Sequence, residues 1–181
     1  MKTRLAAALA VALGGCAQPG LSDFRATLAR QPSATAALGE WCRARGIADP
    51  PDITALPVIG DEVAAGPAIR SALGVTADEP LRYRHVRLSC GDKMLSDARN
   101  WYVPARLTPD MNALLDSTNL PFGKIVAPLG FRRERLAEKR GALDGCPAGT
   151  ILSHRAALRL ADGRAIAWVQ ECYTRANLAG K

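Results

Sequence analysis

The sequence T-I-L-S-H-R-A-A-L-R-L-A-D-G-R-A-I-A-W-V-Q-E-C-Y-T, residues 150–174, decides the fold of this 181-residue chain. Two apolar-rich runs, residues 150–160 and 164–174, flank Ala161-Asp162-Gly163. The Asp-Gly pair favours the positive backbone φ angles of a tight hairpin turn. These residues are therefore predicted to form two antiparallel strands joined by a short turn.

A second hairpin is expected earlier in the chain. Residues 81–88 and 94–103 are rich in strand-forming residues, and Gly91-Asp92-Lys93 separates them. Residues 49–57 are broken by prolines and are expected to be loop or edge structure. The short apolar segment 121–128 is bounded by Pro and Gly and is also predicted to be a strand.

Helical spacing of apolar residues marks other segments. It predicts helices over residues 21–30, 35–45 and 61–73, the last ending at Gly74. Thr108 followed by Pro109 indicates a helix over residues 109–115. The charged segment 131–140 is predicted to be a surface helix. Helices concentrated early and hairpins late indicate an α+β fold, an antiparallel β-sheet with helices packed on one side.

The N-terminal residues form an export signal. Lys2 and Arg4 precede nine apolar residues, 5–13, and Leu13-Gly14-Gly15-Cys16 follows. The apolar run is shorter than the roughly 20 residues that span a bilayer, and the glycines before the cysteine resemble the bacterial lipobox. We therefore expect a signal peptide over residues 1–15, lipidation of Cys16, a tether over 16–20 and one domain over 21–181. The alternative is a buried helix with an incidental cysteine.

The expected location is the cell envelope, with the domain anchored to the membrane through Cys16 and facing the periplasm. Four cysteines then remain for disulfides in an oxidising compartment, Cys42, Cys90, Cys146 and Cys172. Two bridges are plausible on this count, but four cysteines allow three pairings, and the sequence does not choose among them.

Charge and motifs narrow the function. Without Lys2 and Arg4 the chain has 22 basic against 17 acidic residues, and much of the excess lies in residues 132–140. Alternating signs there favour a solvated face over a nucleic-acid patch. No Cys-x-x-Cys pair supports a zinc site, so no metal or other cofactor is expected. His85 and His154 are interpreted as structural groups, since no nucleophile motif accompanies them.

The second half of the chain resembles the chorismate lyase family and, more distantly, the effector-binding domains of transcription regulators with the same fold. The resemblance is carried, in order, by Tyr83-Arg84-His85-Val86, Cys90-Gly91-Asp92, residues 98–104, Pro121-Phe122-Gly123-Lys124 and the C-terminal hairpin. It covers about half of the chain and implies a chorismate lyase-like fold.

The resemblance also implies a site. The family's substrate-gripping arginine corresponds to Arg84, its acidic residue to Glu171 and the apolar residue of its turn to Phe122. Arg99 matches a further arginine, but the stretch after it is one residue longer than in the family. Arginine suits a carboxylate ligand through bidentate contacts, and Glu171 is the candidate proton shuttle, for which burial should raise its pKa. Alternatively, Arg84 and Glu171 form a structural ion pair or face solvent.

Three functions are compatible with these residues. The preferred one is a membrane-anchored lipoprotein that binds a small anionic carboxylate, with aromatic carboxylates among the candidates. The second is a chorismate lyase that forms 4-hydroxybenzoate and pyruvate, with Arg84 and Glu171 as catalytic residues. The third is a structural or interaction lipoprotein whose protein partner is unknown. Trp101, Tyr102 and Phe122 are candidate walls for an aromatic ligand.

Overall fold

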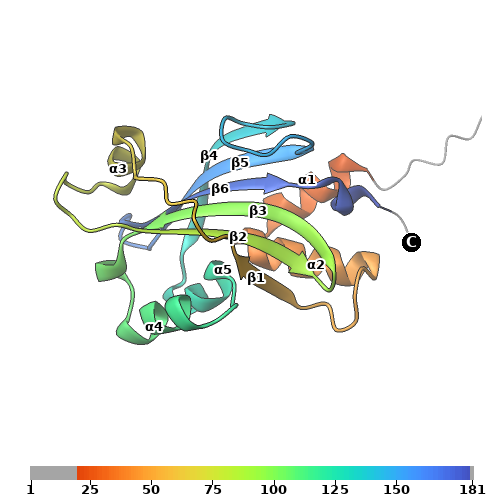
Figure 1. The fold of residues 1–181 in the computed structure, drawn as a ribbon, viewed down its shortest axis with the longest axis horizontal. Coiled ribbons are helices and arrows are strands. Elements are labelled where there is room, and N and C mark those ends of the chain that lie inside the picture. The colour runs from red at the N-terminus through yellow and green to blue at the C-terminus, as the bar shows by residue number, and fades with distance from the viewer. Residues whose placement is uncertain (1–19, 180–181) are drawn as a thin grey trace, which may run out of the picture.

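The computed structural model describes residues 20–179 and arranges them around one six-stranded antiparallel sheet (Figure 1). The strands are β1 (Ile53–Pro57), β2 (Arg82–Cys90), β3 (Lys93–Tyr102), β4 (Arg132–Arg140), β5 (Leu152–Arg159) and β6 (Ala165–Tyr173). Their spatial order is β1-β2-β3-β6-β5-β4. The fold class is the α+β arrangement predicted from the sequence.

Helices cover one face of the sheet. They are α1 (Leu21–Arg30), α2 (Ala34–Arg45), α4 (Pro109–Ser117) and α5 (Phe122–Ile125), and single 3-10 turns occur at Pro104–Arg106, Ala127–Leu129 and Arg175–Leu178. The short helix α3 (Pro67–Leu73) packs instead against Trp101 and Trp168 on the other face. Figure 1 shows α3 at the opposite end of the sheet from α1 and α2.

Both hairpins of the sequence analysis are present. Gly163 has a φ of +87°, which agrees with the positive angle expected of the Asp-Gly turn. Helices α1, α2 and α4 also lie close to their predicted ranges. The side chains of Ser33 and Thr108 cap α2 and α4 by accepting hydrogen bonds from the backbone N–H groups of Ala36 and Met111.

Two neighbouring predictions are wrong in type. Segment 121–128 is not a strand but contains α5, because Phe122 and Ile125 are buried at helical i, i+3 spacing. Segment 131–140 is not a surface helix but the edge strand β4, paired only with β5. Its charged residues suit a sheet edge, where they discourage pairing with another chain.

The segment 61–73 is helical only from Pro67. Proline suits the first helical position because its φ angle is helical and the N–H that it lacks would have no acceptor within the helix. The helix therefore begins at Pro67. Residues 61–66 instead run across the second face of the sheet, where the Val63 carbonyl accepts a hydrogen bond of 2.7 Å from the Trp101 indole. Residues 49–57 were expected to be loop or edge structure, and residues 53–57 of this segment form the edge strand β1.

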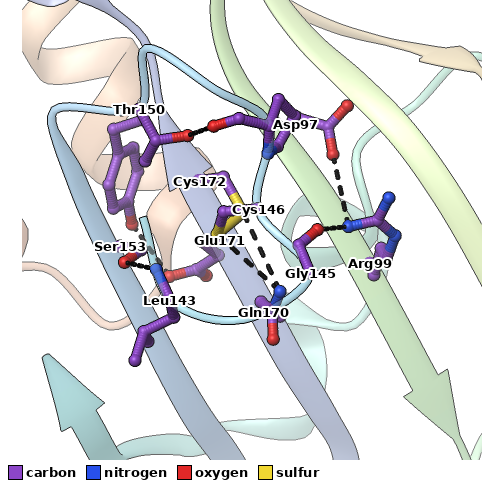
Figure 2. Close-up of a disulfide and its surroundings, with 12 residues drawn as sticks. Asp97, Arg99, Leu143, Gly145, Cys146, Thr150, Ser153, Gln170, Glu171 and Cys172 are labelled. Carbon is purple, nitrogen blue, oxygen red and sulfur yellow. Dashed lines mark hydrogen bonds and ion pairs between the residues drawn. A yellow bond between two sulfur atoms is a disulfide. The ribbon is translucent and has the colours of Figure 1, made fainter. Parts of the chain in front are cut away.

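Two disulfides join distant parts of the fold. Cys42 of α2 pairs with Cys90 of β2, and Cys146 pairs with Cys172 of β6, with Cα atoms 6.4 and 5.6 Å apart. Figure 2 shows the second bridge and the loop that it fixes, whose Gly145 carbonyl accepts a hydrogen bond from Arg99. The two bridges, Cys42–Cys90 and Cys146–Cys172, together make up one of the three pairings that the sequence left open.

The apolar side chains of residues 20–179 pack into a set of buried clusters on both faces of the sheet. Three apolar clusters and both disulfides lie within this range. None of the helices found in this part of the chain is long and apolar enough to cross a membrane. The predicted signal peptide, Cys16 and most of the tether lie outside the described residues.

Removing either disulfide is expected to destabilise the domain. The bridges close loops with sequence separations of 48 and 26 residues, so restricting the unfolded chain contributes about 4 and about 3.5 kcal/mol, respectively. Urea unfolding of residues 17–181 carrying Cys42→Ala/Cys90→Ala or Cys146→Ala/Cys172→Ala should show these losses. Dithiothreitol should destabilise each double variant further, through its remaining bridge. An unfolding free energy equal to that of the unmodified domain would contradict this account.

Candidate functional site

An open groove lies on the helix-covered face, between α2, the start of β1 and the α5 region. Its volume is about 710 Å³. Small residues line it, including Ala36 and Gly39 of α2 and Gly123 of α5. A Cβ atom at Gly39 would lie 3.9 Å from the Ile53 side chain, so any larger side chain at this position would enter the groove. The absence of side-chain bulk on α2 and α5 therefore creates the hollow.

The charges that line this groove are unequally paired. Glu40 accepts a hydrogen bond of 2.9 Å from Arg30 and another from Gln31, and these contacts lower the pKa of the Glu40 carboxyl. Arg43 and Lys124 are exposed and form no salt bridge within residues 20–179, while the exposed Asp52 is the opposing charge at the rim. Two available cations against one carboxylate favour an anionic ligand.

A much smaller cavity lies behind the groove, against the sheet. Its volume is about 30 Å³, and its lining includes the polar residues Asn100 and Glu171 beside Phe122. Ser33, Thr35 and Gly123 line both hollows. A Cβ atom at Gly123 would lie only 3.0 Å from the Ser33 and Thr35 side chains. The close approach of α5 to the start of α2 therefore separates the groove from the inner cavity.

Asn100 was missed by the sequence reasoning. It lies on β3 opposite Arg84 of β2 and Val169 of β6, and only 5% of its surface is exposed. Its side-chain amide forms no hydrogen bond within the described part of the chain. Buried amides are normally hydrogen-bonded, so Asn100 has capacity for a water molecule or a ligand. A polar residue at an inward-facing strand position was the signal that could have identified it.

Glu171 also lines the inner cavity and is 5% exposed. One carboxylate oxygen, Oε2, accepts hydrogen bonds from the Arg133 guanidinium and from the Tyr173 hydroxyl, the latter at 2.8 Å. Burial, together with the nearby Glu171 charge, raises the pKa of Tyr173 well above its ordinary value. The second oxygen, Oε1, forms no hydrogen bond in this part of the structure and remains able to accept one.

A buried polar network extends from Glu171 toward α1. His154, which has no exposed surface, contacts Arg133 through Nδ1 at 3.1 Å and Glu138 through Nε2 at 3.0 Å. Glu138 in turn pairs with Arg25 of α1. Burial lowers the pKa of His154 to about 4, so the imidazole is neutral near pH 7. It then accepts a hydrogen bond from Arg133 and donates one to Glu138.

The ion pair between Arg84 and Glu171, which was the structural alternative to a ligand site, is not formed, because Glu171 pairs with Arg133. Arg84 lies on the same face of the sheet but donates hydrogen bonds to the carbonyls of Leu120 at 3.1 Å and Thr118 at 3.2 Å. Burial lowers its pKa from the usual arginine value. Arg84 is not among the residues that line the inner cavity, and its contacts fix the segment leading into α5. Its predicted ligand-binding and catalytic roles stay predictions.

Arg99 is placed away from the other predicted site residues. Successive residues of a strand face opposite sides of a sheet, so Arg99 faces away from the cavity that Asn100 lines. Its guanidinium donates hydrogen bonds to the Gly145 carbonyl and, at 3.2 Å, to Asp61 (Figure 2 shows the first). Trp101 shares this second face, whereas the rings of Tyr102 and Phe122 lie 5.4 Å apart on the helix-covered face.

The neutral state of His154 predicts a pH dependence of stability. The folded-state pKa of about 4 lies below the ordinary value of 6.5, so the unfolded chain binds the proton more readily between these values. Stability is therefore complete above pH 6.5 and falls as the pH drops toward 4, by on the order of 3 kcal/mol. Urea unfolding at several pH values should show a flatter profile for His154→Gln. Parallel profiles for the two proteins would contradict this assignment.

Comparison with solved structures identifies the fold. PhnF from Mycobacterium smegmatis matches 83% of this chain and 67% of its own, with 15% identity and a TM-score of 0.60. The effector domain of PhnF matches 79% of this chain and 88% of its own, with 16% identity and a TM-score of 0.57. The ligand-binding domain of a GntR-family regulator from Bordetella bronchiseptica matches 67% and 82%, with 16% identity and a TM-score of 0.50. The shared fold is the chorismate lyase-like one.

Sequence comparison gives the family. No protein-family model matches the chain. The uncharacterized protein y4mC from Sinorhizobium fredii is 40% identical over 173 residues, and the match covers 85% of this chain and 73% of that protein. With this identity and coverage, the chain belongs to the family of y4mC.

Proposed function

We propose that this protein binds a small anionic molecule that also carries a hydroxyl or amino group. The observation that carries the proposal is the pair of adjoining hollows, the groove beside Arg43 and Lys124 and the inner cavity beside Asn100 and Glu171. The groove volume of about 710 Å³ falls in the range of small-molecule sites.

The two hollows fit different ends of such a ligand. Arg43 and Lys124 attract the anionic end, and the apolar side chains of Ile53 and Phe131 contact its body. The inner cavity of about 30 Å³ has the size of one water molecule. A hydroxyl or amino group of similar size can donate a hydrogen bond to Glu171 Oε1 and interact with the Asn100 amide.

Entry of that group requires a small movement. Because Gly123 lies against Ser33 and Thr35, α5 has to shift away from the start of α2 before the ligand reaches the inner cavity. Helix α5 is only four residues long, so few backbone hydrogen bonds oppose such a shift.

The alternative of chorismate cleavage has less support. The inner cavity is too small for a chorismate-sized molecule, and Glu171 is already paired with a buried arginine. Arg133 and Tyr173 both donate to one oxygen of this carboxylate, Oε2, so among residues 20–179 only Oε1 is left to contact a substrate.

Matched aromatic probes test the binding proposal. Calorimetric titration of residues 17–181 should show tighter binding of 4-hydroxybenzoate than of benzoate, which lacks the hydroxyl, or 4-hydroxybenzamide, which lacks the charge. Gly39→Leu should weaken binding at least tenfold by filling the groove. Asn100→Leu should remove the preference for the hydroxyl while retaining benzoate binding. Incubation with chorismate in parallel would detect any lyase activity.

Ala44→Leu is the matched control, since Ala44 is an exposed α2 residue that does not line the groove. It should bind 4-hydroxybenzoate as the unmodified domain does. Failure of the folded domain to bind any of the three probes, or equal binding by the Gly39 and Ala44 variants, would reject the proposed site.

We also propose that the protein is exported and anchored to the membrane through Cys16. The support is the lipobox-like sequence before Cys16, together with four cysteines paired in two disulfides. Disulfides of this kind persist mainly in oxidising compartments such as the periplasm. An exported domain would then meet its ligand outside the cytoplasm.

Labelling of expressing bacteria with radioactive palmitate tests this anchoring. The full-length chain should incorporate the label and fractionate with membranes, and Cys16→Ser should abolish both. Cys146→Ser is the control for cysteine loss and should still be labelled. Label in the Cys16 variant, or none in the unmodified chain, would show that the lipobox assignment is wrong.

A further inference from the structure

Basic side chains without partners gather at one end of the sheet. Lys139 and Arg140 end β4, and Arg175 follows β6; all three are exposed. None of them forms a salt bridge or side-chain hydrogen bond within residues 20–179. The nearest acidic residue of β4, Glu138, is already paired with Arg25 and Arg135.

Backbone hydrogen bonds bring these residues together. The N–H of Gly141 donates to the carbonyl of Ile151 at 2.9 Å, and the N–H of Ile151 donates to the carbonyl of Tyr173 at 2.9 Å. The ends of β4 and β6 are therefore linked through the start of β5. Arg140 precedes Gly141, and Arg175 lies two residues after Tyr173.

The first turn of α1 lies at the same end of the molecule. The ion pair between Arg25 and Glu138 joins α1 to β4 directly beside Lys139. Figure 1 shows the start of α1 and the arrowheads of β4 and β6 at the same end of the sheet. Leu21 is four residues before Arg25, which corresponds to roughly 6 Å along a helix.

The chain length between this end and Cys16 is short. Five residues, 16–20, precede Leu21, and a fully extended chain of five residues spans at most about 18 Å. If Cys16 is acylated as proposed above, the end of the sheet that carries Lys139, Arg140 and Arg175 is held close to the bilayer surface.

We propose that Lys139, Arg140 and Arg175 form a lipid-facing surface that docks the domain onto anionic phospholipid headgroups beside its anchor. The proposal rests on the anchoring at Cys16 for its biological setting, whereas the attraction itself depends only on these side chains. Each basic residue near an anionic bilayer strengthens binding roughly fivefold. Asp23 of α1 is the acidic residue that opposes them in the first turn.

Docking would also orient the ligand site. Arg43 and Lys124, the cations of the groove, are not among the three residues of the lipid-facing surface, and no salt bridge within residues 20–179 occupies them. Attraction between these basic side chains and the headgroups would hold the domain in one orientation relative to the bilayer. The lipid anchor alone would let the domain rotate about its tether.

Vesicle sedimentation tests the surface without acylation, using residues 17–181, which include all three apolar clusters and both disulfides. Binding to vesicles of 30% phosphatidylglycerol in phosphatidylcholine should exceed binding to pure phosphatidylcholine and weaken as salt is added. Lys139→Glu/Arg140→Glu should lower the affinity for the anionic vesicles at least tenfold. Far-ultraviolet circular dichroism should confirm that the variant is folded.

Arg87→Glu/Arg132→Glu supplies the matched control. Both residues are exposed, lie away from this end of the sheet and have no partner among residues 20–179, so the variant has the same change in net charge. Its affinity for anionic vesicles should stay within about twofold to threefold of the unmodified domain. Equal losses in the two variants would show a general effect of net charge and overturn the proposal, as would absence of binding to anionic vesicles. Neither result depends on palmitate labelling or on binding of 4-hydroxybenzoate.

Discussion

Burial of β6 along its whole length is the constraint on which the rest of the structure depends. All nine residues from Ala165 to Tyr173 are buried, so both faces of this central strand need cover. The helices cover one face, and α3 with residues 61–66 and the disulfide loop covers the other. Successive residues of β6 point to opposite faces of the sheet, so residues adjacent in sequence contact different elements and have unrelated roles. Glu171 faces the inner cavity, whereas Cys172 bonds to Cys146 on the opposite side.

The buried charges on the helix-covered face are compatible with this burial because they compensate one another. Removing a carboxylate or a guanidinium from water costs several kcal/mol unless a partner and hydrogen bonds replace the lost solvation. Arg133 supplies the charge for Glu171, Tyr173 adds a hydroxyl donor, and neutral His154 accepts from Arg133 without adding a further charge. The network also connects the cavity to α1 through Glu138, so the first helix is fixed against the sheet by polar contacts as well as by its apolar face.

Local signals predicted the parts of the fold that depend on local chemistry. Three such signals act within a few residues, and each gave a correct prediction: the Asp162-Gly163 turn, the Thr108 cap and the helical spacing of α1. The β4 segment could not be read in this way, since its alternating charges also fit a helix surface and only its pairing with β5 decides between them. Of the predicted site residues, Glu171 and Phe122 line the inner cavity, whereas Arg99 faces the other side of the sheet, and their roles stay predictions. Arg133, the partner of Glu171, was assigned to a solvated helix. Asn100 acquires its significance only from the burial around it, which no short motif encodes.

The contact at Gly123 has a consequence for how sequences in this family can diverge. No side chain fits at position 123 while Ser33 and Thr35 keep their present places, since even a methyl group would meet both at 3.0 Å. Position 123 is far from positions 33 and 35 in the chain, but the three residues share one small volume. A relative with a larger residue at position 123 therefore needs a smaller residue at position 33 or 35. Otherwise its α5 is displaced from α2, and the groove and the inner cavity join into one cavity. The residues at these three positions in a family member thus indicate whether its inner cavity is separated from the groove when no ligand is bound.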